Sequence, residues 1–257
     1  MFHHAWAALS STGGFIGVYI YSGDHLYFLA YDDMLDLLNK IFIWLQRWVQ
    51  GIPSGPAHLY DRLATRYLEP SYEHIVEELR DKTSGESLIV EVGCGTGKLL
   101  LKIAETLKPM SVMGIDISRA MIELSKRNLS RSRSRGLVDL ILADAHNMPI
   151  RNQCVDLILS TGTLHHIRQP KRFFDECARV LKEDGEAWIY EFSHDAKYED
   201  LRAIKTPRIF LKILAALHGI PRRIFEKGYI KKALENGGYR YKISYQGAVT
   251  KLILGKT

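Results

Sequence analysis

The chain has 257 residues, 46% of them hydrophobic and 25% charged, which is ordinary usage for a folded protein and excludes disorder over most of the length. The net charge of +6 is moderately basic and by itself identifies no partner. Cys94, Cys154 and Cys177 form no CxxC or Cys/His pair, so we expect neither a disulfide framework nor a metal site. The longest apolar stretch near the start, residues 15–21, is too short to span a bilayer. We therefore expect no signal peptide, no transmembrane helix and a cytoplasmic location.

The first third of the chain is expected to be helical after an unassigned start. Residues 1–33 are rich in Gly, Tyr and His and show no helical periodicity, so no element is predicted there. Apolar residues then recur at helix spacing over residues 34–49. Glycines and prolines interrupt the pattern before two further predicted helices, at residues 57–68 and 70–80.

From residue 87 onward, short apolar strand patterns alternate with helical ones. Such alternation predicts a parallel sheet with helices on both faces. A final pair of strand patterns flanks Gln246 and Gly247, which predicts an antiparallel hairpin that closes the sheet. The predicted fold class is α/β: a Rossmann-like doubly wound sheet of seven strands with the last antiparallel, plus N-terminal helices. The predicted strands are Leu88–Val92, Ser111–Asp116, Leu137–Ala143, Val155–Ser160, Ala187–Phe192, Arg240–Tyr245 and Ala248–Leu254, with a turn at residues 183–185 before the fifth. The main predicted helices are Lys98–Leu107, Arg119–Leu129, Lys171–Leu181, Ala196–Leu217 and Tyr229–Glu235.

The strongest functional signal is a glycine loop, Gly93-Cys94-Gly95-Thr96-Gly97, between the first of these strands and its helix. Glycines let the backbone approach a ligand closely, and a helix N-terminus offers free N–H groups to a carboxylate or phosphate. The acidic Glu91 just before the loop would repel a pyrophosphate but suit an ammonium group. The GxGxG spacing also differs from the GxGxxG of dinucleotide sites, so a nicotinamide-dependent dehydrogenase is disfavoured.

Asp116 ends the next strand about twenty residues after the loop, where a carboxylate can accept both hydroxyls of a ribose. With the loop, it predicts a site for an amino acid linked to a nucleoside.

These motifs resemble those of class I S-adenosylmethionine-dependent methyltransferases, especially the small-molecule branch that includes ubiquinone and menaquinone C-methylases. The resemblance covers about Tyr60 to the C-terminus. It implies S-adenosylmethionine as the cofactor, with the methionine part at the glycine loop, the ribose at Asp116 and the adenine beside Ile117. In the family, an acid in the position of Asp144 accepts from the adenine amino group. The implied cofactor-binding residues are Tyr60, Tyr67, Glu91, Gly93, Cys94, Gly95, Gly97, Asp116, Ile117, Asp144, Ala145, Ser160 and Thr161.

Three histidines follow the fourth and fifth predicted strands and are candidate general bases: His165, His166 and His194. For His165 and His166, a structural or cofactor-shell role is favoured over general-base catalysis. The tyrosine-bearing segment at residues 60–67 resembles a lid over the cofactor. We predict an N-terminal extension and helix at residues 1–56 and a methyltransferase domain at residues 57–257, in which residues 196–230 cap the acceptor.

The predicted function is methyl transfer from S-adenosylmethionine to a small-molecule or lipid-like acceptor. The alternatives are an RNA methyltransferase and a non-catalytic subunit that binds the cofactor within a complex. An arginine-serine tract at residues 126–135 could hold RNA but is typical of a solvated loop. RNA is therefore a possible partner that the sequence does not favour, and stable DNA binding is not expected. The aromatic residues Phe42, Trp44 and Trp48 favour packing, with a membrane-surface or dimer contact as the alternative. The sequence does not determine the oligomeric state.

Overall fold

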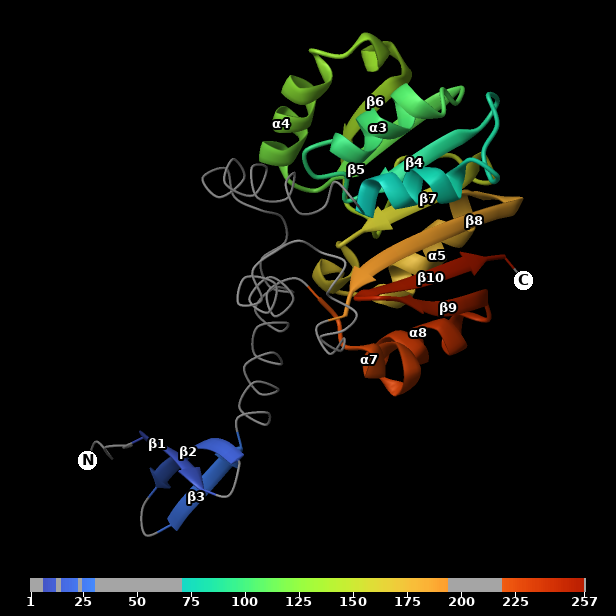
Figure 1. Cartoon of the computed structure of the whole chain (residues 1–257). Coiled ribbons are helices and arrows are strands. Elements are labelled where there is room, and N and C mark those ends of the chain that lie inside the picture. Colours follow the sequence, from blue (N-terminus) through green and yellow to red (C-terminus); the bar gives the residue numbers. More distant parts are fainter. Residues whose placement is uncertain (1–6, 13–14, 23–24, 31–70, 194–218, 257) are drawn as a thin grey trace. The chain divides into compact units, whose positions relative to one another are not determined.

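The structure is a computed structural model that describes residues 7–12, 15–22, 25–30, 71–193 and 219–256 (Figure 1). The chain divides into two compact units, Met1–Gln46 and Arg47–Thr257. The predicted helices at residues 34–49, 57–68 and 196–217 lie outside the described residues.

The described part of the first unit is a three-stranded antiparallel sheet of β1 (Ala7–Thr12), β2 (Phe15–Ser22) and β3 (His25–Ala30). Sequence analysis assigned no element here. In the register, Thr12 pairs with Phe15 and Ser22 pairs with His25, so each connection has two residues. Those connecting residues are Gly-Gly and Gly-Asp, dipeptides typical of tight hairpins, and β-branched and aromatic residues fill β2. The sequence features that indicate these strands are therefore the two glycine-containing dipeptides and the β-branched and aromatic residues between them.

The second unit contains one mixed sheet in the order β6-β5-β4-β7-β8-β10-β9. β10 runs antiparallel to both its neighbours, and the five strands from β6 to β8 in this order are parallel. This confirms the predicted seven-stranded doubly wound sheet with an antiparallel last strand. The strands are β4 (Leu88–Val92), β5 (Ser111–Asp116), β6 (Val138–Leu142), β7 (Val155–Thr161), β8 (Leu181–Phe192), β9 (Arg240–Gln246) and β10 (Val249–Gly255).

Helices cover both faces of this sheet (Figure 1). Residues 71–79 are helical, as predicted. The other described helical elements are α3 (Lys98–Thr106), α4 (Arg119–Leu129), η1 (Arg133–Leu137), η2 (Leu164–His166), α5 (Pro170–Val180), α7 (Arg222–Lys227) and α8 (Tyr229–Gly237). The short helix α7 falls in the predicted cap, where no separate helix was expected. Among the described residues, none of the helices has the length and apolar character needed to span a membrane.

Two apolar cores lie on the two sides of the sheet. One packs α5 and α8 against alternate strand residues such as Val90 and Ile158. The other packs residues 75–79 and α3 against the intervening ones, such as Ile89 and Leu157. Because successive side chains of a strand point to opposite faces, strands buried on both faces are apolar throughout. This explains why the central strands read as continuous apolar runs.

The predicted turn at residues 183–185 is instead part of β8. Leu181 pairs with Val155 and Glu186 pairs with Leu157, so the strand carries several extra residues opposite Asp156. Gly185 is required in this bulge because a Cβ there would lie 2.9 Å from the carbonyl oxygen of Val155.

Candidate cofactor site

The glycine loop joins β4 to α3 and is held against the end of β5. Gly93, Gly95 and Gly97 have φ values of 75°, 51° and 74°, a conformation that only glycine adopts at little cost. The backbone N–H groups of Gly93 and Cys94 both donate to the carbonyl oxygen of Ile115, at 2.7 and 3.0 Å. The three glycines are therefore backbone requirements that place the loop at the carboxyl edge of the sheet.

The space around the loop differs from one glycine to the next. A Cβ at Gly93 would collide with the side chain of Thr163. At Gly95, and at Gly162 after β7, no described atom lies within 4 Å of the position that a Cβ would take. Both open positions lie beyond strand ends at the point where the order of the sheet reverses, which is where ligands bind in doubly wound folds.

Asp116, at the end of β5, holds the loop through its carboxylate. Oδ2 accepts from the N–H of Gly95 at 2.9 Å, and Oδ1 accepts from the N–H of Ser118 at 2.8 Å. Burial raises the pKa of this carboxyl, and the hydrogen bonds from Ser118, Gly95 and Ile117 partly offset the effect. Each carboxylate oxygen has a further lone pair, so Asp116 can hold the loop and still accept from two hydroxyl groups.

Glu91, near the end of β4, is a buried acid with unused hydrogen-bonding capacity. Its side chain belongs to a residue only 3% exposed, and Oε2 has no hydrogen-bond partner among the described residues. Burial raises its pKa well above the usual value, and the nearby Asp116 carboxylate raises it further. A buried carboxylate without a partner is costly, and a cation placed beside it would remove much of that cost.

Two hydroxyl groups at the end of β7, like the Glu91 carboxylate, are buried and have unused hydrogen-bonding capacity. Ser160 Oγ and Thr161 Oγ1 are buried and form no hydrogen bond within the described part of the chain. β7 pairs directly with β4, so these hydroxyls and Glu91 come from adjacent strand ends. Polar groups without a hydrogen-bond partner in the described ranges thus occur at both central strands, as expected where a polar ligand binds.

After β6, Asp144 and His146 form a linked pair. Asp144 Oδ1 accepts from the backbone N–H of His146 at 2.9 Å and lies 2.6 Å from ring atom Nδ1. Burial acts to raise the pKa of Asp144, but the hydrogen bonds from His146 and the positive charge of Arg172 outweigh it and lower the pKa. The Asp144 side chain is 45% exposed. Ala145 lies between them, partly buried.

The segment after Asp144 is clamped by three charged residues of α5: Arg172, Glu176 and Arg179. The N–H of Met148 donates to Glu176 Oε2 at 2.8 Å, and Arg179 Nη2 donates to the carbonyl oxygen of Met148 at 2.9 Å. Arg172 Nε donates to the carbonyl oxygen of His146 at 3.1 Å. These contacts were not predicted from the sequence, although the three residues share one face of a helix at i, i+4 and i+7.

His165 and Glu191 form a buried pair at the ends of β7 and β8. Both side chains are 0% exposed, and His165 Nδ1 lies 2.9 Å from Glu191 Oε1. Glu191 Oε2 accepts from the backbone N–H of His165 at 3.2 Å, and the His166 ring centroid lies 4.0 Å from that of His165. Sequence analysis selected the two histidines but not Glu191, whose carboxylate fixes the orientation of the His165 ring.

Most of the predicted site residues thus come to the carboxyl edge of the sheet. Ile117 is 40% exposed there, as a contact for a flat ring would be. Cys94 is buried, and burial raises the pKa of its thiol well above the usual value, which fits packing rather than reactivity. Tyr60, Tyr67 and His194 lie outside the described residues.

The strand order and the loop define the fold of the class I S-adenosylmethionine-dependent methyltransferases. Residues 90–189 match the family described as a methyltransferase domain. A structure of a putative S-adenosylmethionine-dependent methyltransferase from Methanococcus maripaludis superposes with a TM-score of 0.67 at 22% identity, covering 81% of this chain and 95% of that one.

Two curated relatives match part of the chain. A malonyl-[acyl-carrier protein] O-methyltransferase from Geobacter sulfurreducens is 30% identical over 159 residues, which are 59% of this chain and 55% of that protein. A phthiotriol/phenolphthiotriol dimycocerosates methyltransferase from Mycobacterium tuberculosis is 34% identical over 120 residues, 46% of this chain and 43% of that protein. The chain therefore spans about half the length of these relatives.

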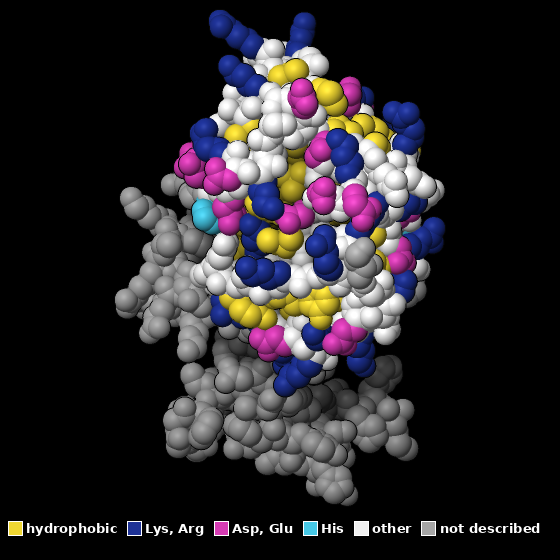
Figure 2. All heavy atoms as spheres, turned by 90° about the vertical axis from the view of Figure 1, so that its right-hand side faces the viewer, with side chains coloured by type: hydrophobic (Ala, Val, Ile, Leu, Met, Phe, Trp, Pro, Cys, Tyr) yellow, Lys and Arg dark blue, Asp and Glu magenta, His cyan; other side chains and the backbone are white. Residues whose placement is uncertain are grey.

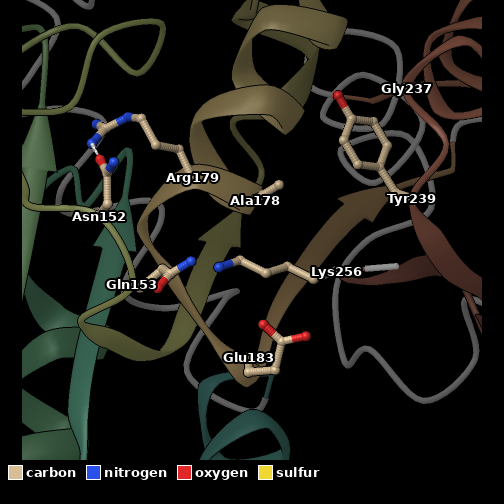
Figure 3. Close-up of a pocket in the computed structure, with 8 residues that line it drawn as sticks. All are labelled: Asn152, Gln153, Ala178, Arg179, Glu183, Gly237, Tyr239 and Lys256. Carbon is tan, nitrogen blue, oxygen red and sulfur yellow. Dashed lines mark hydrogen bonds between the residues drawn. The ribbon is translucent and has the colours of Figure 1, made fainter.

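A separate hollow of about 470 Å³ lies at the opposite, amino edge of the parallel strands. Figure 2 views this side, on which acidic and basic side chains are interspersed with apolar ones. In Figure 3 the side chains of Gln153 and Lys256 point toward one another, and Arg179 turns away to Asn152, with which it forms a 2.7 Å hydrogen bond. Acidic and basic residues both line this hollow, and it lies apart from the candidate cofactor site.

Proposed function

We propose that this protein transfers a methyl group from S-adenosylmethionine to a small-molecule or lipid-like acceptor. The observation that carries the proposal is Glu91: an acid buried beneath a glycine loop, without a partner for Oε2 among the described residues, beside a second acid at the next strand end. The cofactor has an α-ammonium group for Glu91 and ribose hydroxyls for Asp116. The methyltransferase family match and the shared fold support this assignment.

The residues would act mainly by binding and positioning. Asp116 and the loop would orient the ribose and the methionine part, with Asp144 and Ile117 at the adenine. The cofactor supplies an activated methyl group on a sulfonium, so no covalent protein intermediate is needed. Holding two reactants in line can supply roughly 7–11 kcal/mol of the barrier reduction in favourable cases. If the acceptor must lose a proton, the buried His165–Glu191 pair or its neighbour His166 is the candidate base.

The acceptor class is inferred from the names of two relatives, a malonyl-[acyl-carrier protein] O-methyltransferase and a phthiotriol/phenolphthiotriol dimycocerosates methyltransferase. A third relative, a probable tRNA methyltransferase 9B from Mus musculus, is the reason that RNA stays the alternative acceptor. We propose that residues 57–257 form the methyltransferase domain, that residues 60–67 and 196–230 enclose the acceptor, and that His194 lies near it. As part of the same proposal, we place the chain in the small-molecule branch that includes the ubiquinone and menaquinone C-methylases.

Calorimetry on the full chain tests the cofactor assignment. We expect micromolar binding of S-adenosylhomocysteine and little binding of NAD. In Asp116→Ala the affinity should fall at least about tenfold, because hydrogen bonds to a charged group contribute roughly 1.5–3 kcal/mol each. That variant should also lose stability, since the carboxylate holds Gly95 and Ser118. Tight NAD binding without S-adenosyl ligand binding would refute the proposal.

RNA is a less favoured acceptor on structural grounds. The arginines of the basic tract lie in and beside η1, just before β6, at the amino edge of the sheet, whereas the candidate cofactor residues lie at the carboxyl edge. Cofactor binding without turnover on any acceptor would instead favour the non-catalytic subunit.

A further inference from the structure

The ring of His146 is held from both sides. It belongs to a residue 8% exposed. Its Nδ1 lies 2.6 Å from Asp144 Oδ1, and its Nε2 accepts from the backbone N–H of Gln169 at 3.2 Å. Gln169 is the N-cap residue of α5, so the imidazole bridges the end of β6 to the start of that helix.

These contacts define one tautomer. A backbone N–H can only donate, so Nε2 facing Gln169 must be the acceptor. The proton of the neutral ring is then on Nδ1, where it is donated to Asp144. Protonated imidazole would turn a second donor toward the Gln169 N–H, so the neutral form fits both partners. Arg172 of α5 donates to the His146 carbonyl oxygen, and its charge also acts on Asp144.

The consequence concerns the Asp144 carboxylate. Both donors of His146 converge on Oδ1, and no hydrogen bond to Oδ2 is formed among residues that the structure describes. A carboxylate fixed at one oxygen by two donors cannot rotate freely, so Oδ2 is presented in a constant direction at the carboxyl edge. The exposed Ile117 and Leu142 lie at the neighbouring strand ends of the same edge.

We propose that His146 is a positioning residue that orients Asp144 and thereby sets the preference of the site for an adenine ring. An adenine 6-amino group donates to an oriented carboxylate oxygen, whereas a 6-oxo group would face it with a second acceptor. The inference rests on the proposed binding of S-adenosyl ligands, and it assigns the selectivity for the base to a residue that does not itself contact the base.

Two substitutions separate the contacts of the ring. In His146→Asn, the amide nitrogen takes the place of Nδ1, so the donor to Asp144 is kept and the acceptor for Gln169 is lost. In His146→Gln, the amide oxygen can take the place of Nε2, so the acceptor is kept and the donor to Asp144 is lost. His146→Ala removes both contacts.

The experiment measures the Kd of each full-length variant for S-adenosylhomocysteine and for S-inosylhomocysteine, which has a 6-oxo group. We expect the wild type and His146→Asn to prefer the adenosyl ligand by about tenfold or more, the effect of one hydrogen bond to a charged group. In His146→Gln and His146→Ala the preference should fall to within about threefold, mainly through weaker adenosyl binding. Thermal unfolding identifies any variant that is not folded.

The outcomes are distinguishable. If the wild type binds neither ligand, the proposed function fails. If it binds S-adenosylhomocysteine and the preference is the same in His146→Gln as in the wild type, His146 does not orient the carboxylate and this inference is wrong. A purely structural role would weaken both ligands equally and leave their ratio unchanged.

Discussion

Glu91 is a buried acid that is expected to lower the stability of the free protein and to raise its affinity for a cationic ligand. Its carboxylate is enclosed, one oxygen lacks a partner among the described residues, and Asp116 adds a like charge nearby. Folded proteins tolerate such a group where a ligand supplies the opposite charge. The same residue should therefore reduce the stability of the free protein and increase its affinity for an ammonium-bearing ligand.

Glu91→Gln tests this trade. Burial raises the pKa of Glu91 well above its unfolded value of about 4.3, so the folded state binds the proton more tightly. The stability that this proton provides is fully present below the unfolded pKa and is lost as the pH rises through the folded pKa. The variant removes this cost, and at pH 8 it should be more stable than the wild type by roughly 1–3 kcal/mol. Near pH 4 the difference should disappear. Denaturant unfolding at both pH values measures it, and calorimetry should show weaker S-adenosylhomocysteine binding. A variant that is less stable at pH 8 would contradict this account.

A matched pair of glycine substitutions separates loop packing from ligand space. In Gly93→Ala the new methyl group meets Thr163, so we expect a loss of stability of roughly 1–3 kcal/mol from strain and overpacking. In Gly95→Ala no described atom obstructs the methyl group, which instead enters the open space, so affinity should fall more than stability. Both positions have positive φ and share that backbone cost. Equal losses of stability with unchanged binding in Gly95→Ala would argue against a ligand beside it.

At the scale of elements, α5 supports the site from outside it. Glu176 accepts from Met148 and from Arg179, and these bonds fix the segment that carries Asp144 and His146. The hydrogen bond from Arg179 lowers the pKa of Glu176, so its contribution to stability is present above the unfolded pKa of about 4.3 and is lost as the pH falls through the folded value.

Glu176→Gln should therefore lower the free energy of unfolding by about 1–2 kcal/mol at pH 7, because it weakens charged hydrogen bonds to a partly buried group. The difference from the wild type should shrink as the pH is lowered below 4. Glu123→Gln is the control, because its exposed pair with Lys126 should contribute little. Denaturant titrations across pH measure both. A loss in Glu176→Gln that persists unchanged in acid would mean that the charge is not involved.

The elements predicted best are those whose signals are local. β4, β5 and their helices lie where apolar runs, glycines and periodicity place them, and the loop glycines have the required φ values. The bulge in β8 was mistaken for a turn because its Glu-Asp-Gly sequence also suits a turn. Contacts between distant residues, such as those of Glu191 and Glu176, depend on which strand ends meet, and the sequence of either element alone does not carry that information.

At the scale of the whole molecule, the two edges of the sheet have different characters. The carboxyl edge carries the glycine loop, Asp116 and the buried Glu91, which we propose bind the cofactor. The amino edge carries exposed arginines at positions 131, 133 and 135, in and beside η1. It also carries the hollow that acidic and basic residues line (Figure 3). Among the described residues, Glu91 Oε2, Ser160 Oγ and Thr161 Oγ1 are buried without a hydrogen-bond partner at the carboxyl edge.

This separation predicts that the arginine tract is dispensable for the small-molecule reaction. The combined variant Arg131→Gln, Arg133→Gln and Arg135→Gln removes three exposed cations at the amino edge and should leave S-adenosylhomocysteine affinity within about twofold of the wild type. Any RNA binding by the wild type should be weak and should fall steeply with salt, with a shallower slope in the variant because fewer phosphates are neutralised. Calorimetry and a filter-binding salt series measure the two properties. An RNA acceptor would have to reach both this tract and the opposite edge of the sheet. If the wild type bound RNA in a salt-resistant way and methylated it, and the triple variant lost that methyl transfer, RNA would be the acceptor instead of a small molecule.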